Sequence, residues 1–200
     1  QEADSPSPWS GNFDHVDYLA QQASFPRYAY TEHANLWIGN YGTAILSRLP
    51  MKSAIGLTFP STPPTASKGF TLAQVAWPTA NGTSRLVDIV SVHLDFSRKS
   101  VRKQQLEELV TVLKTRQGPL IIMGDFNSEW LAEQYLVESI ADRSELHVYN
   151  TGSENLDTYK DQRLDWILLT RDLEFESYRV ASETLSDHRA VVASVRLRAN

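Results

Sequence analysis

Short strand-like runs, arranged in consecutive groups, constrain the fold of this chain more than any other feature. Five of them follow one another between residues 28 and 94 with only turn residues in between, another occupies 119–123, and three more lie between residues 164 and 197. Their β-branched and aromatic residues, bounded by Gly, Pro, Asn and Ser, are typical of strands. Such a chain does not form a helical bundle, and the grouping disfavours a simple alternation of strands and helices. Two packed sheets fit best.

Helical spacing occurs in three segments beside these groups. We expect helices over residues 13–23, 98–116 and 129–140, because apolar residues recur there at intervals of three and four. Asn12 and Ser128 stand where the N-caps of the first and third helices are expected. Strands and helices together predict an α+β fold, a four-layer α/β sandwich of two mostly antiparallel sheets flanked by helices.

The length and composition suit one folded domain without disulfides. The chain has 200 residues, 42% of them hydrophobic, and no cysteine, so disulfide bonds, thiolate metal sites and a cysteine nucleophile are excluded. A formal net charge of −5 argues against a broad nucleic-acid-binding surface, since such surfaces are basic. No apolar run is long enough to cross a bilayer, and the sequence leaves the cellular compartment open.

A carboxylate and an amide follow the apolar run 119–123. Asp125 and Asn127 are two residues apart, so they would point the same way if the strand continued through them. Such residues often only form turns, because their side chains bond to the nearby backbone. His93 lies near the end of the apolar run 85–94, where a histidine is also more often structural. Taken singly, none of these residues identifies a site.

Further charged residues adjoin other strand-like runs or the chain terminus. Asp165 interrupts an apolar run, Asp187 and His188 precede the last run, and Glu2 stands at the start of the chain. Side chains at the ends of several strands can converge on one edge of a framework, where chemistry is commonly placed. Oxygen ligands without cysteine suit Mg²⁺, with Mn²⁺ and Ca²⁺ as alternatives. A hard cation beside a His–Asp pair suits phosphoester hydrolysis.

Six sequence segments together resemble the endonuclease/exonuclease/phosphatase superfamily. In chain order they are QE at 1–2, GTAILSR at 42–48, VHLD at 92–95, GDFN at 124–127, RLDWIL at 163–168 and SDH at 186–188. Each is short, but the six in this order cover nearly the whole chain. The superfamily includes deoxyribonucleases, abasic-site endonucleases, sphingomyelinases and inositol-polyphosphate phosphatases. The resemblance therefore implies a divalent-metal-dependent phosphoester hydrolase.

The resemblance implies a metal site and a catalytic pair. Glu2 matches the glutamate that holds the divalent metal, and Asp187 would lie near the metal or its water. His188 would act as the general base and pair with Asp165, or it would hold the phosphate in an alternative mechanism.

The resemblance also implies three residues that handle the phosphate. Asp125 and Asn127 would position the nucleophile and hold a phosphate oxygen. His93 would contact the scissile phosphate or protonate the leaving oxygen.

Residues 1–200 are expected to form a single domain of this superfamily that is truncated at its N-terminus. Members usually begin with a strand that carries an Asn or Asp, followed by a helix and a second strand that ends in the QE motif, whereas this chain starts at Gln1. A sheet without those strands would have an open edge. No obligate protein partner is visible, although another chain could cover that edge.

The choice of substrate stays open among three classes. A weaker likeness, over residues 1–22 and 38–50, is to the nuclease-like domain of proteins that remodel GPI-anchor lipids. The acidic charge balance and the lack of a basic stripe favour a lipid head group or a small phosphodiester over duplex DNA. Trp9 and Trp37 are the candidates for the exposed aromatic residues of a lipid site, with a place in the core as the alternative for either. A nuclease acting on DNA or RNA is the alternative, with residues 97–103 as its basic cluster. A non-catalytic binding module on the same fold is the second alternative.

Overall fold

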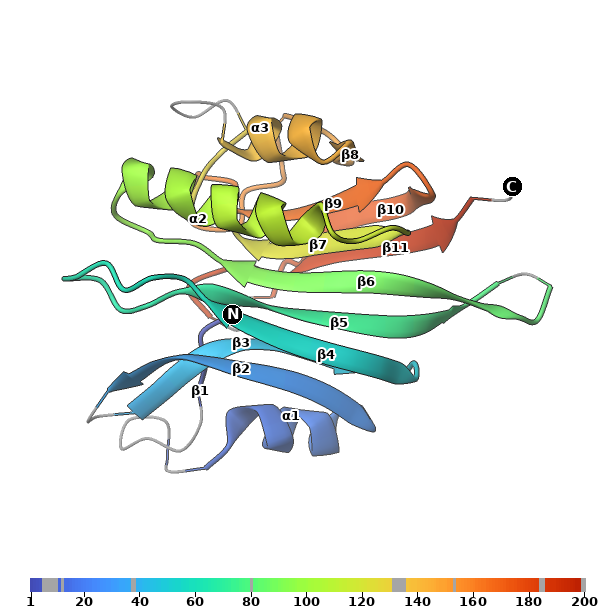
Figure 1. The fold of residues 1–200 in the computed structure, drawn as a ribbon, viewed down its shortest axis with the longest axis horizontal. Helices are drawn as coiled ribbons and strands as arrows, with labels where there is room; N and C mark the ends of the chain where they lie inside the picture. Colours follow the sequence, from blue (N-terminus) through green and yellow to red (C-terminus); the bar gives the residue numbers. More distant parts are fainter. Residues whose placement is uncertain are drawn as a thin grey trace.

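The computed structural model describes residues 1–4, 11, 13–36, 39–79, 81–130, 136–152, 154–183 and 186–198 (Figure 1). The helices of this part are α1 (His15–Gln22), α2 (Lys99–Leu113) and α3 (Leu136–Arg143). The strands are β1 (Ala3–Asp4), β2 (Arg27–Leu36), β3 (Gly39–Ser47), β4 (Met51–Thr58), β5 (Gly69–Pro78), β6 (Ser84–His93), β7 (Leu120–Asp125), β8 (Leu146–His147), β9 (Asp165–Thr170), β10 (Leu173–Val180) and β11 (Val191–Leu197).

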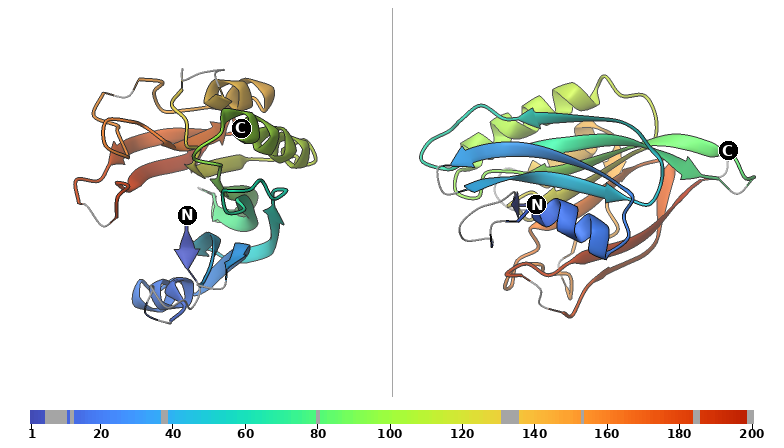
Figure 2. Two further views of the ribbon diagram at one scale, coloured as in Figure 1. Left: turned by 90° about the vertical axis from the view of Figure 1, so that its left-hand side faces the viewer. Right: turned by 90° about the horizontal axis from the view of Figure 1, so that it is seen from below.

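The described strands form three sheets in two layers. One layer is a six-stranded sheet in the order β4-β5-β6-β7-β9-β8, and the other comprises the sheets β1-β3-β2 and β10-β11. Helices α2 and α3 cover one face of the six-stranded sheet, and α1 lies on the outer side of the three-stranded sheet (Figures 1 and 2). The predicted sandwich is confirmed, with its second layer divided between two sheets.

Most neighbouring strands are antiparallel, as predicted. The Asn81-Gly82 turn joins β5 to β6 in a hairpin whose last pair is Pro78 with Ser84. The exception is β6 with β7, which run parallel because α2 carries the chain back across the sheet between them. The polar ends of β6 and β7 therefore lie at the same edge of the sheet.

Gly124 lets β7 approach β6 closely near this edge. It is in register with Val92 and has a φ of +148°, a backbone conformation that side-chain-bearing residues rarely adopt. A Cβ atom there would lie 2.0 Å from the carbonyl oxygen of Val92. The glycine is thus required by the sheet itself.

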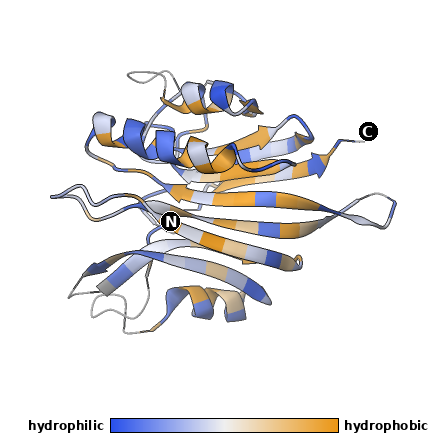
Figure 3. Cartoon of the chain, viewed as in Figure 1, coloured by the Kyte–Doolittle hydropathy of each residue, from blue (hydrophilic) through white to orange (hydrophobic). Residues whose placement is uncertain are grey.

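Two apolar clusters hold the six-stranded sheet between its neighbours, and the central strands are correspondingly hydrophobic (Figure 3). Buried residues such as Val90, Leu109 and Ile122 form the cluster beneath α2 and α3. The opposite face of the sheet packs on β10 and β11, with Leu169 and Leu173 fully buried. Burial of this kind is the main favourable term in folding.

The contact between the three-stranded sheet and the six-stranded sheet is polar instead. Thr43 and Thr71 bond each other through their hydroxyl oxygens at 2.9 Å, and Thr71 also donates to Thr31 at 2.7 Å. The imidazole of His33 bonds Thr43 on one side and Thr58 on the other. Burial lowers the pKa of His33 to about 4, so this ring is neutral.

The helices depart from the sequence prediction at their starts. The side chain of Asp14, not Asn12, caps α1 by accepting a hydrogen bond from the backbone N–H of Asp17, and Asn12 lies outside the described residues. The described part of α3 begins at Leu136, and the carbonyl of Ser128 instead accepts a hydrogen bond from the indole of Trp166. Among the helices of the described residues, none is both long and apolar enough to span a bilayer.

Candidate active site

Three predicted residues stand in one row across the end of the six-stranded sheet. His93 ends β6 and is paired in register with Asp125 at the end of β7. Asp125 is in turn paired with Asp165, which begins β9. Because the pairing places them side by side on neighbouring strands, residues far apart in sequence become adjacent.

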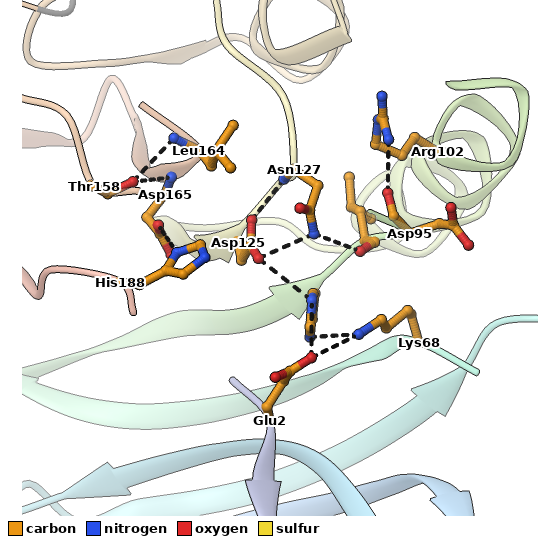
Figure 4. Close-up of polar contacts among 12 residues, drawn as sticks. Glu2, Lys68, Asp95, Arg102, Asp125, Asn127, Thr158, Leu164, Asp165 and His188 are labelled. Atoms are coloured by element: carbon orange, nitrogen blue, oxygen red, sulfur yellow. Dashed lines mark hydrogen bonds and ion pairs between the residues drawn. The ribbon is translucent and has the colours of Figure 1, made fainter. Parts of the chain in front are cut away.

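His188 joins this row through Asp165. The two side chains meet at 2.7 Å between His188 Nδ1 and Asp165 Oδ2 (Figure 4). The hydrogen bond to Asp165 raises the pKa of His188 against the opposing effect of burial. Since Nδ1 faces the carboxylate, Nε2 is the nitrogen left to act on a substrate.

Thr158 holds the two partners of this pair in place. Its buried hydroxyl oxygen accepts hydrogen bonds from the backbone N–H groups of Leu164 and Asp165, each at 3.1 Å. Its carbonyl accepts one from the N–H of Arg189, the residue after His188. The ring of Tyr159 lies against His188, with the ring centroids 4.8 Å apart. The segment Thr158–Tyr159 thus contacts both partners of the Asp165–His188 pair or their neighbours.

Asp125 and Asn127 lie together, but not for the predicted reason. The strand ends at Asp125, and Asn127 has a φ of +48°, so strand alternation does not reach it. A turn brings the two together instead: the backbone N–H of Asn127 donates to Asp125 Oδ1 at 2.7 Å and its side-chain amide donates to Oδ2 at 3.1 Å. The amide also donates to the carbonyl of Leu94. Burial, followed by the charge of Asp165, raises the pKa of Asp125 to about 6.

His93 contacts a buried lysine that sequence reasoning missed. Lys68 is 3% exposed, and its ammonium lies 3.3 Å from His93 Nδ1 and 3.1 Å from Glu2 Oε1. An ammonium group only donates, so Nδ1 accepts and Nε2 carries the ring proton. That nitrogen lies 3.5 Å from Asp125 Oδ2. Burial and the charge of Lys68 hold the pKa of His93 well below its usual range, so the ring is neutral.

A single cleft of about 980 Å³ gathers the predicted residues. All seven line it, namely Glu2, His93, Asp125, Asn127, Asp165, Asp187 and His188. His93, Asp125 and Asp165 of the row line it, and Glu2, the residue before β1 of the three-stranded sheet, points toward Lys68 (Figure 4). Asp187 is exposed beside His188. The cleft therefore combines carboxylates and imidazoles around one space, and the buried ammonium of Lys68 contacts two of them, Glu2 and His93.

The donor chemistry of this cleft fits a hard divalent cation held by few protein ligands. Among the described residues, no three His, Asp or Glu side chains are grouped closely enough to form a complete metal cage. Mg²⁺ commonly binds through one or two carboxylates and keeps its other positions for water and substrate phosphate. Glu2, whose side chain is 66% exposed, is open to such an ion, and Asp187 supplies a second carboxylate at the same cleft.

Two supporting residues gave little signal in the sequence. Lys68 lies in a loop rich in Pro, Ser and Thr, where a lysine is usually solvated. Thr158 precedes the site motif at 163–168 without any apolar run of its own. The structure explains the position of Lys68, because the next residue, Gly69, is in register with His93.

Comparison with known proteins identifies the family of the chain. A model of the endonuclease/exonuclease/phosphatase family matches residues 6–188. The chain belongs to the endonuclease/exonuclease/phosphatase family. A search of curated protein sequences found no significant match.

Solved structures share the family fold. A family member from Beutenbergia cavernae superposes with a TM-score of 0.72 at 17% identity, covering 97% of this chain and 60% of that protein. The human Nocturnin catalytic domain has a TM-score of 0.68 at 17% identity, with 93% and 77% covered. A mannosyl-6-phosphatase from Bacteroides thetaiotaomicron has a TM-score of 0.64 at 16% identity, with 91% and 82% covered. This chain thus spans three-fifths of the Beutenbergia protein.

Proposed function

We propose that this chain is a divalent-metal-dependent phosphoester hydrolase, most specifically a phosphodiesterase, with His188 as the general base paired to Asp165. The observation that carries the proposal is the 2.7 Å contact of this pair at one end of a row that continues to Asp125 and His93 in the same cleft. The family supports the hydrolase class, since relatives of the same fold include a mannosyl-6-phosphatase and Nocturnin.

His188 and Asp165 at one end of the row would activate the water, and Asp125 and His93 at the other end would act on the phosphate and the leaving group. His188 Nε2 takes a proton from water, and the Asp165 carboxylate stabilises the imidazolium that forms. The water oxygen then bonds to phosphorus while the bond to the leaving oxygen breaks. His93, being neutral with its proton on Nε2, suits hydrogen bonding to the phosphate better than proton donation. Asp125, with a pKa raised to about 6, suits proton donation better, and in its protonated form it would give its proton to the leaving oxygen as that bond breaks.

Glu2 and Asp187 would hold the divalent cation, for which Mg²⁺ is the first choice and Mn²⁺ or Ca²⁺ the alternatives. The ion would supply positive charge to the phosphoryl oxygens. Lys68 donates a hydrogen bond to Glu2 Oε1 and so brings an ammonium group to this end of the cleft, and burial lowers the pKa of that ammonium.

A lipid head group or small phosphodiester suits this chain better than duplex DNA. The basic cluster at 97–103, the candidate nucleic-acid surface, is partly used by the fold: Arg98 donates to the carbonyls of Thr62 and Pro63, and Arg102 donates to the carbonyl of Asp95. Trp9 and Trp37, the candidate aromatic residues of a lipid site, lie outside the described residues. A nuclease and a binding module remain the alternatives that the assay below separates.

The test is hydrolysis of bis(4-nitrophenyl) phosphate with and without Mg²⁺, followed by a comparison of plasmid DNA with a panel of sphingolipid and inositol-phospholipid substrates. We expect hydrolysis that stops in excess EDTA and returns with Mg²⁺ or Mn²⁺. Full activity in EDTA would overturn the metal mechanism, and fast nicking of plasmid at moderate salt would favour the nuclease. Substrate binding without any hydrolysis would favour the binding module.

A further inference from the structure

Phe96 is an exposed aromatic residue inside the candidate active-site cleft. Its side chain is 63% exposed, the largest value among the large hydrophobic residues that the structure describes. It lines the same cleft as His93 and Asp125. The ring centroid lies 6.0 Å from the ammonium of Lys68. An apolar ring in this position covers no part of the core, and its exposure has no structural explanation in the apolar clusters of the fold.

The loop that carries Phe96 is tightly held. The adjacent Asp95 is fully buried, and its carboxylate accepts hydrogen bonds from the backbone N–H groups of Ser97 and Arg98. The backbone of Asp95 is held as well, since its N–H donates to Gln105 and its carbonyl accepts from Arg102. The aromatic ring is therefore presented on a rigid support, so little conformational entropy is lost when a ligand contacts it.

Phe96 lies on the side of the cleft toward which the leaving group of the phosphoester is expected to depart. In an in-line displacement, the attacking water and the leaving oxygen lie on opposite sides of the phosphorus. His188 lies at the β9 end of the row and His93 at the β6 end, with Asp125 between them. Water activated by His188 therefore expels the leaving group toward His93. Phe96 lies three residues after His93 and lines the same cleft, and its ring is near the Lys68 ammonium that contacts His93 Nδ1.

We propose that Phe96 is a specificity-determining residue that forms a subsite for a planar ring in the leaving group of the phosphoester. The proposal rests on the function proposed above, because it uses the direction of attack from His188. Aromatic rings stack on one another with a preference beyond simple burial of area. The carboxylates and imidazoles of the cleft handle the phosphate, whereas Phe96 offers an exposed aromatic ring near His93 that contacts the group attached to the phosphate.

A binding measurement tests the subsite without turnover. Isothermal titration calorimetry in the presence of Mg²⁺ compares phenylphosphonate, hexylphosphonate and methylphosphonate on the wild type and on Phe96→Ala, Phe96→Leu and Phe96→Trp. We expect the preference for phenyl over methyl to fall about 3- to 10-fold in the Ala and Leu variants and to persist in the Trp variant. Phe13→Ala is the matched control, since Phe13 is 43% exposed and lies outside the cleft.

The outcomes separate the subsite from the function. An unchanged phenyl preference in Phe96→Ala would overturn the subsite even if the enzyme hydrolyses phosphodiesters normally. Equal binding of the hexyl and phenyl compounds, retained in Phe96→Leu, would indicate a site for an acyl chain and would overturn the planar-ring assignment. In turnover, Phe96→Ala should raise KM for methyl 4-nitrophenyl phosphate by a similar factor with kcat less affected. A wild type that binds phenylphosphonate with this preference but hydrolyses nothing would refute the proposed function alone.

Discussion

Replacing Gly124 with alanine should destabilise the sheet at the edge that carries the candidate active site. The added Cβ would lie 2.0 Å from the carbonyl oxygen of Val92, whereas Cβ contacts under 3.0 Å are essentially never seen, so β6 and β7 must separate by 3.0 − 2.0 = 1.0 Å or more. The unfavourable φ costs about 1–3 kcal/mol. Each weakened hydrogen bond of the ladder adds about 1 kcal/mol. We expect a total loss of about 3–5 kcal/mol in the free energy of unfolding.

Thermal unfolding followed by circular dichroism measures this loss. For a chain of this size, 1 kcal/mol corresponds to about 2–4 °C in Tm, so Gly124→Ala should lower Tm by roughly 6–20 °C. Gly118→Ala is a closely matched control, because Gly118 has a φ of +156° but its Cβ would meet nothing within 4 Å. The difference between the two variants therefore isolates the steric contact with Val92 from the backbone conformation.

The same substitution should affect activity below its melting temperature. Asp125 follows Gly124 directly, and its carboxylate lies 3.5 Å from His93 Nε2. A shift of 1 Å between the strands would misplace these groups, which commonly costs on the order of 100-fold in rate. If Gly124→Ala melts and turns over like Gly118→Ala, the close approach of β6 and β7 does not position the site, and the reasoning fails.

Three further predictions concern individual side chains. Asp165→Asn and His188→Ala should each reduce kcat about 10²–10⁴-fold, and the double variant should be little worse than the worse single variant. His188 must be neutral to accept a proton, so activity should fall as the pH drops through its pKa. Because Asp165 raises that pKa, Asp165→Asn should move the acid limb of the pH–rate profile to lower pH. Near-normal turnover by the folded single variants would show the pair to be structural. Lys68→Met should reduce kcat/KM about 10- to 100-fold, since a charged hydrogen bond at the Glu2 end of the cleft is lost, and an unchanged value would exclude Lys68 from the reaction. Burial alone would raise the pKa of Asp95, but its hydrogen bonds lower the pKa to about 2. The ionised carboxylate should therefore stabilise the folded protein by about 2 kcal/mol above pH 4, and this stabilisation should disappear between about pH 4 and pH 2. Urea titrations at several pH values measure the loss, which Asp95→Asn should lack.

The sequence predicted the candidate-site residues at strand ends, but not the residues that hydrogen-bond to them. His93, Asp125 and Asp165 could be found because a polar residue that interrupts or ends an apolar run stands out against period-two alternation. Their common row could not be found, because the register between strands depends on tertiary packing. Lys68 was missed since nothing in its loop announces that its side chain is buried.

Local turns explain the remaining differences. Asn127 was expected on a strand face, but the strand ends at Asp125, and the positive φ of Asn127 belongs to a turn that brings its amide back onto Asp125. Asparagine tolerates that conformation better than most residues, so the local sequence permitted two outcomes. The capping residue of α1 differs from the prediction for a similar reason, because Asp14 and Asn12 are residue types that cap helices equally well.

The hydrogen-bonded layer of threonines and His33 between the sheets should make the three-stranded sheet locally less stable than the rest of the molecule. Hydrogen bonds to Thr43 and Thr71 contribute less than burial of an equal apolar area would, so the three-stranded sheet should open locally at a lower free energy than the apolar clusters around β6 and β7. Glu2 enters the cleft from β1 of that sheet. In mild denaturant the three-stranded sheet should therefore open first and move the Glu2 carboxylate away from the cleft, while His93, Asp125 and Asp165 stay in register. Activity should then be lost at a lower denaturant concentration than the one that unfolds the whole protein.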